Sequence, residues 1–243
     1  MNKTSIFIAA SAAVALSGLV PQNANAVTLA SWSFDGKTLF GGATLTSSLM
    51  GTGYTAEVGV GTMFGIHTVT NSVWSYPTGN GSTSSMSATG WTVGNSSWDF
   101  VVSTALHTAI KINFDQISSS TGPRNWKLQY KIGAGSFTDY TTYNVLANAS
   151  PNVWASSASN VAYKYSFDLS AVTAIENQSS ITFRLLVNGS QPAGTGTAAF
   201  PTTGTNRIDN ASIEATPVPE PTTLAILAAG AGVAAARRRK KNS

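Results

Sequence analysis

The sequence predicts an all-β body folded as an antiparallel β-sandwich, and three observations lead to that prediction. Apolar and polar residues alternate in segment after segment, most regularly over 161–169 and 181–187. Gly, Ser and Asn gather between these segments, where the chain must turn, and only 169–177 suggests a helical turn. Strands with one apolar face, separated by such turns, are typical of two antiparallel sheets packed face to face.

Before residue 98 the predicted elements are a first strand at 27–34, a loop or short irregular strands at 41–62, a strand at 63–69 and a polar loop at 71–89. The polar loop holds Pro77 and the turn sequence Gly79-Asn80-Gly81. From there on the alternation predicts strands at 98–102, 110–114, 126–132, 137–145, 161–169 and 181–187, and a closing strand at 206–215. Gly133-Ala134-Gly135 predicts a hairpin turn.

The N-terminus has the three parts of a secretory signal peptide. A lysine stands near the start, residues 6–20 are apolar, and Ala24-Asn25-Ala26 gives the small-x-small pattern that signal peptidase cleaves. We therefore expect residues 1–26 to be removed and the mature chain to begin at Val27.

The C-terminus also has three parts. Val218-Pro219-Glu220-Pro221 is rigid, because each proline fixes its own φ and keeps the preceding residue out of the helical region. Residues 222–236 carry no charge, and as a helix they would be roughly 22 Å long. The basic cluster that follows consists of Arg237, Arg238, Arg239, Lys240 and Lys241, which should stop transfer and stay on the cytoplasmic side.

These three parts resemble the PEP-CTERM sorting signal of Gram-negative, exopolysaccharide-producing bacteria. The resemblance implies that Val218 to Pro221 are recognised by exosortase, a membrane-embedded transpeptidase-like enzyme. It further implies that the helix and the basic cluster hold the chain in the inner membrane until processing. The protein would then reach the cell surface or the extracellular matrix. The resemblance covers about 26 of the 243 residues and says nothing about the body.

The charge balance of the body argues against a polyanionic partner. The whole chain has a formal net charge of +4. Between residues 27 and 217, however, eight Lys and Arg stand against nine Asp and Glu, which leaves −1. The basic excess belongs to the two terminal segments, so we expect no nucleic-acid binding.

The chain contains no cysteine, which excludes disulfides, thiolate metal sites and a catalytic thiol. The body must therefore fold around an ordinary hydrophobic core, for which its length is sufficient. We expect one domain at 27–214, a linker with the Pro-Glu-Pro motif at 215–221, a transmembrane helix at 222–236 and a basic cytoplasmic tail at 237–243.

Four runs of the body, at 127–132, 165–170, 181–185 and 206–210, resemble the jelly-roll domains of exported bacterial proteins, which are similar to carbohydrate-binding modules. Domains of this kind often hold structural Ca²⁺ through an Asp of the closing strand. The resemblance makes Asp209 a candidate calcium ligand, although the sequence has no dense Asp-x-Asp-x-Asp-Gly loop. A turn-bonded Asp209 is the alternative. We expect no other cofactor.

The body offers little catalytic chemistry. His67 and His107 lie in separate segments, and two histidines are too few for a zinc site. A glycosidase needs two carboxyls facing each other across a cleft. The nine acids of the body are scattered over nine segments, and several stand beside turns, where capping is their ordinary role. We therefore expect no enzymatic activity.

Two of the six tryptophans are candidates for sugar contact. Trp74 precedes Pro77 and Trp154 follows Pro151, so both lie among loop residues. An exposed ring there could stack on a sugar, whereas a buried one would close the end of the sandwich.

Together these observations predict an exported, non-enzymatic structural or polysaccharide-associated protein of the cell envelope, with exopolysaccharide as a candidate partner. A carbohydrate-binding module and a carbohydrate-active enzyme are the alternatives. Coplanar exposed aromatic rings would favour the former, and two carboxyls meeting in a cleft would favour the latter.

Overall fold

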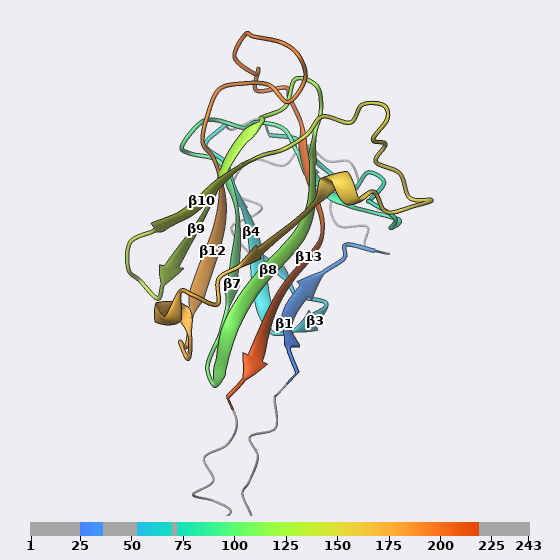
Figure 1. The fold of residues 1–243 in the computed structure, drawn as a ribbon. Helices are drawn as coiled ribbons and strands as arrows, with labels where there is room; N and C mark the ends of the chain where they lie inside the picture. The colour runs from blue at the N-terminus through green and yellow to red at the C-terminus, as the bar shows by residue number, and fades with distance from the viewer. Residues whose placement is uncertain (1–24, 36–52, 70–71, 219–243) are drawn as a thin grey trace, which may run out of the picture. The chain divides into compact units, whose positions relative to one another are not determined.

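The computed structural model describes residues 25–35, 53–69 and 72–218, and these form an antiparallel β-sandwich (Figure 1). The strands are β1 (Val27–Trp32), β2 (Tyr54–Thr55), β3 (Val58–Gly59), β4 (Gly61–Ile66), β5 (Trp74–Ser75), β6 (Met86–Ala88), β7 (Ser97–Val102), β8 (His107–Ser118), β9 (Asn125–Ile132), β10 (Thr138–Asn144), β11 (Lys164–Asp168), β12 (Ile181–Val187) and β13 (Asn206–Pro217). Among the described residues there are also two single 3₁₀ turns, η2 (Val161–Tyr163) and η3 (Thr173–Ile175). In this described part, no helix is long and apolar enough to span a membrane.

The strands build two sheets, named here after their central strands. The β13 sheet has the order β11-β8-β13-β1-β3, and β6 adds to β13 with β5 beside it. The β12 sheet has the order β10-β9-β12-β7-β4-β2. From β7 onward the chain crosses repeatedly between the sheets, as in a jelly roll, and all strand pairs are antiparallel. The predicted fold class is therefore confirmed.

The core fills the space between the sheets and is rich in aromatic rings. Every second residue of the long strands is fully buried, as period-two alternation requires. Five tryptophans lie in it: Trp32, Trp74, Trp91, Trp98 and Trp126. Their tilted and edge-to-face contacts, with centroids 5.1–5.6 Å apart, have the geometry that aromatic pairs prefer.

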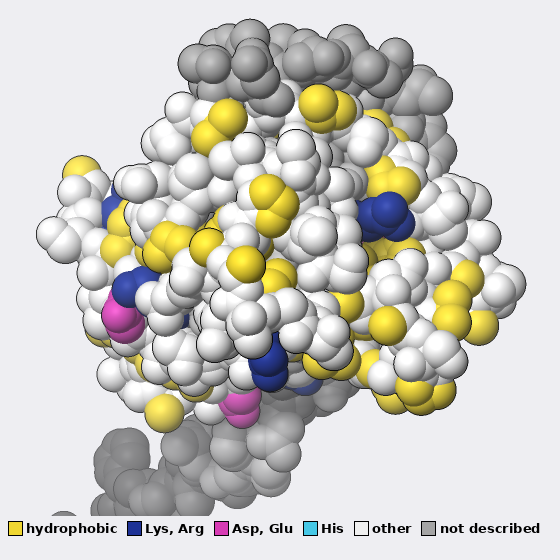
Figure 2. All heavy atoms as spheres, turned by 90° about the horizontal axis from the view of Figure 1, so that it is seen from above, with side chains coloured by type: hydrophobic (Ala, Val, Ile, Leu, Met, Phe, Trp, Pro, Cys, Tyr) yellow, Lys and Arg dark blue, Asp and Glu magenta, His cyan; other side chains and the backbone are white. Residues whose placement is uncertain are grey.

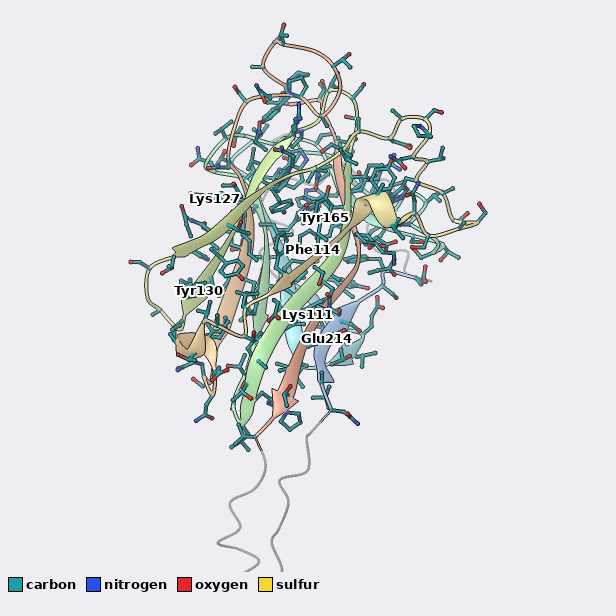
Figure 3. All side chains as sticks on the ribbon, in the orientation of Figure 1. Lys111, Phe114, Lys127, Tyr130, Tyr165 and Glu214 are labelled. Atoms are coloured by element: carbon teal, nitrogen blue, oxygen red, sulfur yellow. The ribbon has the colours of Figure 1, made fainter. Side chains whose placement is uncertain are left out.

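Tyrosine hydroxyls join the edge strands of the two sheets on one side. Tyr165 of β11 stacks on Phe114 of β8 with centroids 5.5 Å apart (Figure 3), and its hydroxyl donates to the carbonyl of Asn144 in β10 at 3.0 Å. Tyr140 of β10 donates in turn to the carbonyl of Asp168 in β11 at 2.6 Å. These bonds close the sandwich between β10 and β11, where the two sheets would otherwise splay.

Several predicted boundaries were wrong. The strand predicted at 161–169 begins only at Lys164, after the 3₁₀ turn η2. Residues 71–89 are not only a loop, because β5 and β6 form within them, β5 pairs with β6, and β6 pairs with β13. Residues 215–217 belong to β13 rather than to a linker. Ala215 is buried opposite Val27, and Pro217 lies opposite His107, so the sheet continues to Pro217.

The sandwich has two distinct ends. β1 begins and β13 ends at the lower end in Figure 1, and the long loops gather at the upper end, called here the loop end. The 12 residues of β13 run from one end to the other. At about 3.4 Å per residue, they separate the loop end from Val218 by roughly 40 Å.

Candidate functional site

The outer side of the β12 sheet carries a row of polar side chains that crosses four strands. Asp99 of β7 lies opposite Arg184 of β12, which lies opposite Gln129 of β9, which lies opposite Asp139 of β10. Their strand neighbours, such as Phe183, point into the core, so the row must point outward. We call this row, together with Phe137 and Lys127, the polar face.

Arg184 is fixed at the centre of the polar face. Its Nε donates to Asp99 Oδ1 at 2.9 Å and its Nη2 donates to Oδ2 at 2.6 Å, which is the bidentate geometry of a strong ion pair. Ser97 donates to the same carboxylate at 2.7 Å. The ring of Phe137, from the β9–β10 hairpin, covers the guanidinium with its centroid 3.7 Å from Cζ, a cation–π contact.

A second ion pair lies at the β10 side of the polar face. Lys127 and Gln129 both donate to Asp139, at 3.0 and 2.6 Å (Lys127 is labelled in Figure 3). The hydrogen bonds from Gln129 and Lys127 hold the pKa of Asp139 below its usual value. The polar face therefore presents alternating charges that already satisfy one another and are held in place.

Two further carboxylates meet on the outer side of the β13 sheet, under the 77–85 loop. Asp115 and Asp209 are cross-strand partners, and the side-chain amide of Asn210 donates to both, at 3.0 and 3.1 Å. Both acids are buried, and burial raises the pKa of Asp209 to about 6 and also raises that of Asp115. The pair is sealed in the protein and lines neither of the two cavities described below.

The surroundings of Asp209 do not fit a calcium ligand. Its Oδ2 accepts hydrogen bonds from the backbone N–H of Asn80 at 2.8 Å and from the Ser82 hydroxyl at 2.5 Å, while Oδ1 accepts from the backbone N–H of Asn210. A cation needs oxygen ligands around it, and N–H groups pointing at the same carboxylate repel it. Within the described ranges no three His, Asp or Glu side chains gather as a metal site. Asp209 is turn-bonded here, the alternative weighed from the sequence.

The two tryptophans predicted to contact sugar are both buried, so that part of the prediction was wrong. Trp74 is fully buried against His67 and Trp98 in the core. Trp154 is 4% exposed, and its indole N–H donates to the carbonyl of Thr78 at 2.6 Å. With Tyr163 and Ile117 it forms a small second core on the outer side of the β13 sheet. Neither ring offers a free face for stacking.

The histidines are not brought together. His67 is buried among Trp74 and Trp91, its Nδ1 lies 3.1 Å from the Gly90 carbonyl, and burial lowers its pKa to about 4. His107 begins β8, with its Nδ1 2.7 Å from the carbonyl of Ala105. His67 Nδ1 also lies 3.4 Å from the Ser72 hydroxyl, but among the hydrogen bonds that the structure describes neither histidine is bonded to a carboxylate.

Two cavities open at the loop end. The larger, about 330 Å³, is lined by Ser120, Thr121, Pro192, Gly194, Thr195, Gly196, Ala198, Ala199 and Pro201. The smaller, about 210 Å³, is lined by Ile117, Ser118, Ser119, Ser120, Asn148, Thr205 and Arg207. Ser120 borders both. Figure 2 looks down on this end and shows mostly backbone and uncharged polar side chains, with scattered apolar side chains and few charges among the described residues.

Sequence patterns do not identify Arg207 as the centre of a cavity, nor the polar face as a row. Arg207 stands in a predicted strand, and Phe137 stands at the start of another. The useful clue was the alternation itself, since it places 184, 129 and 99 on outward positions of neighbouring strands.

Most of the predicted sorting residues lie outside the described ranges. These are Ala24, Pro219, Glu220, Pro221 and the basic cluster 237–241. Ala26 precedes β1, which begins at Val27, and Val218 follows β13, its backbone N–H donating to the carbonyl of Leu106 at 2.8 Å.

Comparison with protein families finds the PEP-CTERM protein-sorting motif at residues 217–240, which confirms the resemblance of the C-terminus. The motif indicates an exported protein, anchored in a membrane until an exosortase-type enzyme processes it. No curated protein matches the sequence.

Solved structures with a similar arrangement of strands share little sequence with this chain. One is described as "CBM4 structure and function" (12% identity, 64% of this chain and 87% of the other covered, TM-score 0.39). Another is the CBM22-1 xylan-binding domain from Paenibacillus barcinonensis Xyn10C (14% identity, 79% and 96% covered, TM-score 0.39). A third is the K1 cleaved adhesin domain of Lys-gingipain from Porphyromonas gingivalis W83 (12% identity, 79% and 98% covered, TM-score 0.38).

Proposed function

We propose that this protein is a non-enzymatic, polysaccharide-associated component of the cell surface or extracellular matrix. The observation that carries the proposal is the position of the sorting motif. The motif begins at residue 217, where β13 ends, so the sandwich is what the sorting signal delivers. Because β13 ends opposite the loop end, the described loops and cavities lie far from the residue at which the motif begins.

The polar face supports polysaccharide as that partner. A sugar chain presents hydroxyl groups that both donate and accept hydrogen bonds. Along the row Asp99–Arg184–Gln129–Asp139, on adjacent strands about 4.8 Å apart, the guanidinium of Arg184 and the carboxylate of Asp139 reach solvent, while the nearly buried Asp99 and Gln129 hold them in place. These groups hold one another in place, so little side-chain entropy remains to be lost on binding. The half-exposed Phe137 adds an apolar surface beside them.

The bonding of the carboxylates supports a non-enzymatic role. In the described ranges eight of the nine acids of the body accept hydrogen bonds from protein donors; these are Asp35, Glu57, Asp99, Asp115, Asp139, Asp168, Glu176 and Asp209. Glu214 lies opposite Lys111 in the β13 sheet (Figure 3). A glycosidase needs one carboxyl free to donate a proton and another free to attack or to activate water.

The test has two arms that use the full chain. In an exosortase-containing host, mass spectrometry of the surface and culture fractions should find mature protein without residues 222–243. Purified protein should then be retarded by polysaccharide gels in affinity electrophoresis without releasing reducing ends. Retention of residues 222–243 in the surface protein would contradict the sorting proposal, and release of reducing ends would favour the enzyme alternative.

A matched pair of variants tests the polar face itself. Asp139→Ala removes the exposed carboxylate of the row, whereas Lys111→Ala removes a side chain from the outer side of the other sheet. Retardation should fall only in the first variant. Equal retardation of the two variants would exclude the polar face as the contact surface.

A further inference from the structure

Arg207 differs from the other half-buried arginine of the body in having no partner. It lies on β13 between Asn206 and Ile208, both fully buried in the core, so its side chain points to the outer side of the β13 sheet. There it lines the 210 Å³ cavity at the loop end. Within the described ranges no hydrogen bond or ion pair reaches its guanidinium.

Carboxylates that could neutralise Arg207 from inside the body are lacking. Segments 36–52 and 70–71 contain no Asp or Glu. Asp209, two residues along the strand, is occupied by donors from Asn80, Ser82 and Asn210. None of the cavity-lining residues is acidic.

Partial burial therefore removes water from this guanidinium without giving it a counter-charge. Its pKa is lowered by desolvation alone. A desolvated, unpaired charge costs free energy, and an incoming anion would relieve that cost.

The other residues of the cavity add neutral hydrogen-bond donors. The Asn148 side chain uses its oxygen to accept from the backbone N–H of Trp154 at 3.1 Å, which leaves its NH₂ group available. In the described part of the chain the hydroxyls of Ser120 and Thr205 form no hydrogen bond. A guanidinium fork with amide and hydroxyl donors is the donor set that binds planar or tetrahedral oxyanions.

The size of the cavity limits the ligand. Its 210 Å³ equals the volume of about seven waters at roughly 30 Å³ each, below the range of drug-sized pockets. It can take a carboxylate or sulfate with part of one sugar ring. The neighbouring cavity across Ser120, lined by Pro192, Ala198 and Pro201, can take the apolar side of the next ring.

We propose that the Arg207 cavity binds the oxyanion group, carboxylate or sulfate, of an acidic polysaccharide. The proposal rests on the polysaccharide association proposed above and extends it to charged chains. It requires one guanidinium at one acidic group, and not the basic surface that the net charge of −1 between residues 27 and 217 argues against. It adds a contact at the loop end to that of the polar face, and Arg207 lies roughly 34 Å of strand before residue 217, where the sorting motif begins.

The test compares charged and uncharged forms of the same polymer on the full chain in nonionic detergent. Polygalacturonate is paired with its methyl ester, dextran sulfate with dextran, and free glucuronate with glucose, all at about 0.15 M ionic strength. The wild-type protein should prefer at least one charged form. Binding of polygalacturonate alone identifies a carboxylate site, and binding of dextran sulfate alone identifies a sulfate site.

Three variants test whether the preference for charged polymers depends on Arg207. Arg207→Met should weaken binding of the charged form by roughly 10- to 100-fold, the range of a charged hydrogen bond. The affinity of Arg207→Lys for the charged form should lie between those of the wild type and Arg207→Met, because an ammonium group keeps the charge but loses the bidentate hydrogen bonding of the guanidinium. Arg124→Met is the matched control, since Arg124 is exposed next to β9 and lines neither cavity. It should change binding less than threefold.

The outcomes separate the two proposals. Equal binding of charged and neutral forms, or equal loss in Arg207→Met and Arg124→Met, overturns the oxyanion site and leaves polysaccharide association standing. Arg207-dependent binding of glucuronate without binding of any polymer keeps the oxyanion site and overturns polysaccharide association. Binding of none of the six probes overturns both.

Discussion

The polar face and the loop end each hold a half-buried arginine, and the two arginines have opposite surroundings. Arg184 is gripped by both oxygens of Asp99 and covered by Phe137. Arg207 faces hydroxyls and an amide but no carboxylate. The charge of Arg184 is paired within the protein, so its role in holding the β12 sheet together explains it. The charge of Arg207 is desolvated and has no counter-charge among the described residues, which suggests that a ligand supplies one. Both arginines are half-buried, so only their partners distinguish a structural arginine from a binding one.

The largest loss of stability is expected from a substitution in the second core, which packs beside the loop end. Trp154→Ala removes an indole that is 4% exposed. Its N–H donates to the carbonyl of Thr78, and its ring centroid lies 5.6 Å from that of Tyr163. The free energy of unfolding should fall by about 3 kcal/mol, as for other large-to-small changes. Oxyanion binding should be lost with it, because the segment that carries Asn148 loses its anchor. Urea denaturation measures the first effect and affinity electrophoresis the second.

Trp154→Phe is the control, since it keeps a ring but removes the bond to Thr78. It should cost about 1 kcal/mol. A loss below 1 kcal/mol for Trp154→Ala would show that the second core does not stabilise the loop end.

The next effect concerns the polar face. Asp99→Ala leaves Arg184 without its counter-charge on a quarter-exposed side chain and should cost about 2–3 kcal/mol of unfolding free energy. Asp139→Ala, on the same row, should cost less than about 1 kcal/mol, because its side chain is 64% exposed. If urea denaturation gave equal losses of unfolding free energy for Asp99→Ala and Asp139→Ala, the buried Asp99–Arg184 pair would stabilise the fold no more than the exposed Asp139–Lys127 pair.

A smaller, pH-dependent effect is expected at Asp209. Burial raises its pKa to about 6 from a usual 3.8, so the folded state binds this proton more tightly than the unfolded state does. Its contribution is therefore fully present below about pH 4 and is lost as the pH rises through 6. Ser82 can accommodate the proton, because its hydroxyl lies 3.2 Å from the Ser84 carbonyl and can donate there instead.

The check compares unfolding free energies of wild type and Asp209→Asn at pH 4 and pH 7. Relative to the variant, the wild type should lose about 2 kcal/mol on going to pH 7. His67 has the opposite trend, since its lowered pKa makes acid destabilising, but it is present in both proteins and cancels. A difference that does not change with pH would show that Asp209 keeps an ordinary pKa.

The sequence predicted the sandwich well because period-two alternation is a local pattern that the two-sided burial of strands imposes directly. It located 98–102 and 181–187 as strands almost to the residue. It failed at Trp74 and Trp154, because turn-forming neighbours describe the backbone and say nothing of what packs over a ring. The polar row and the unpaired Arg207 could not be predicted either, since both depend on strand order and register, which join residues up to about 90 positions apart.

The smallest effect on stability is expected for Arg207. Arg207→Met removes a charge that no described residue pairs with and keeps the aliphatic part that packs beside Ile117, its cross-strand partner. Since the charge is desolvated without compensation, its removal should change the unfolding free energy by less than about 0.5 kcal/mol, or raise it. Arg184→Met is the counterpart and should cost about 2 kcal/mol, because it leaves Asp99 buried and unpaired. Thermal and urea unfolding of both variants in the same buffer decide the matter. If Arg207→Met were as damaging as Arg184→Met, Arg207 would be a structural cation after all, and the contrast between the two arginines would disappear.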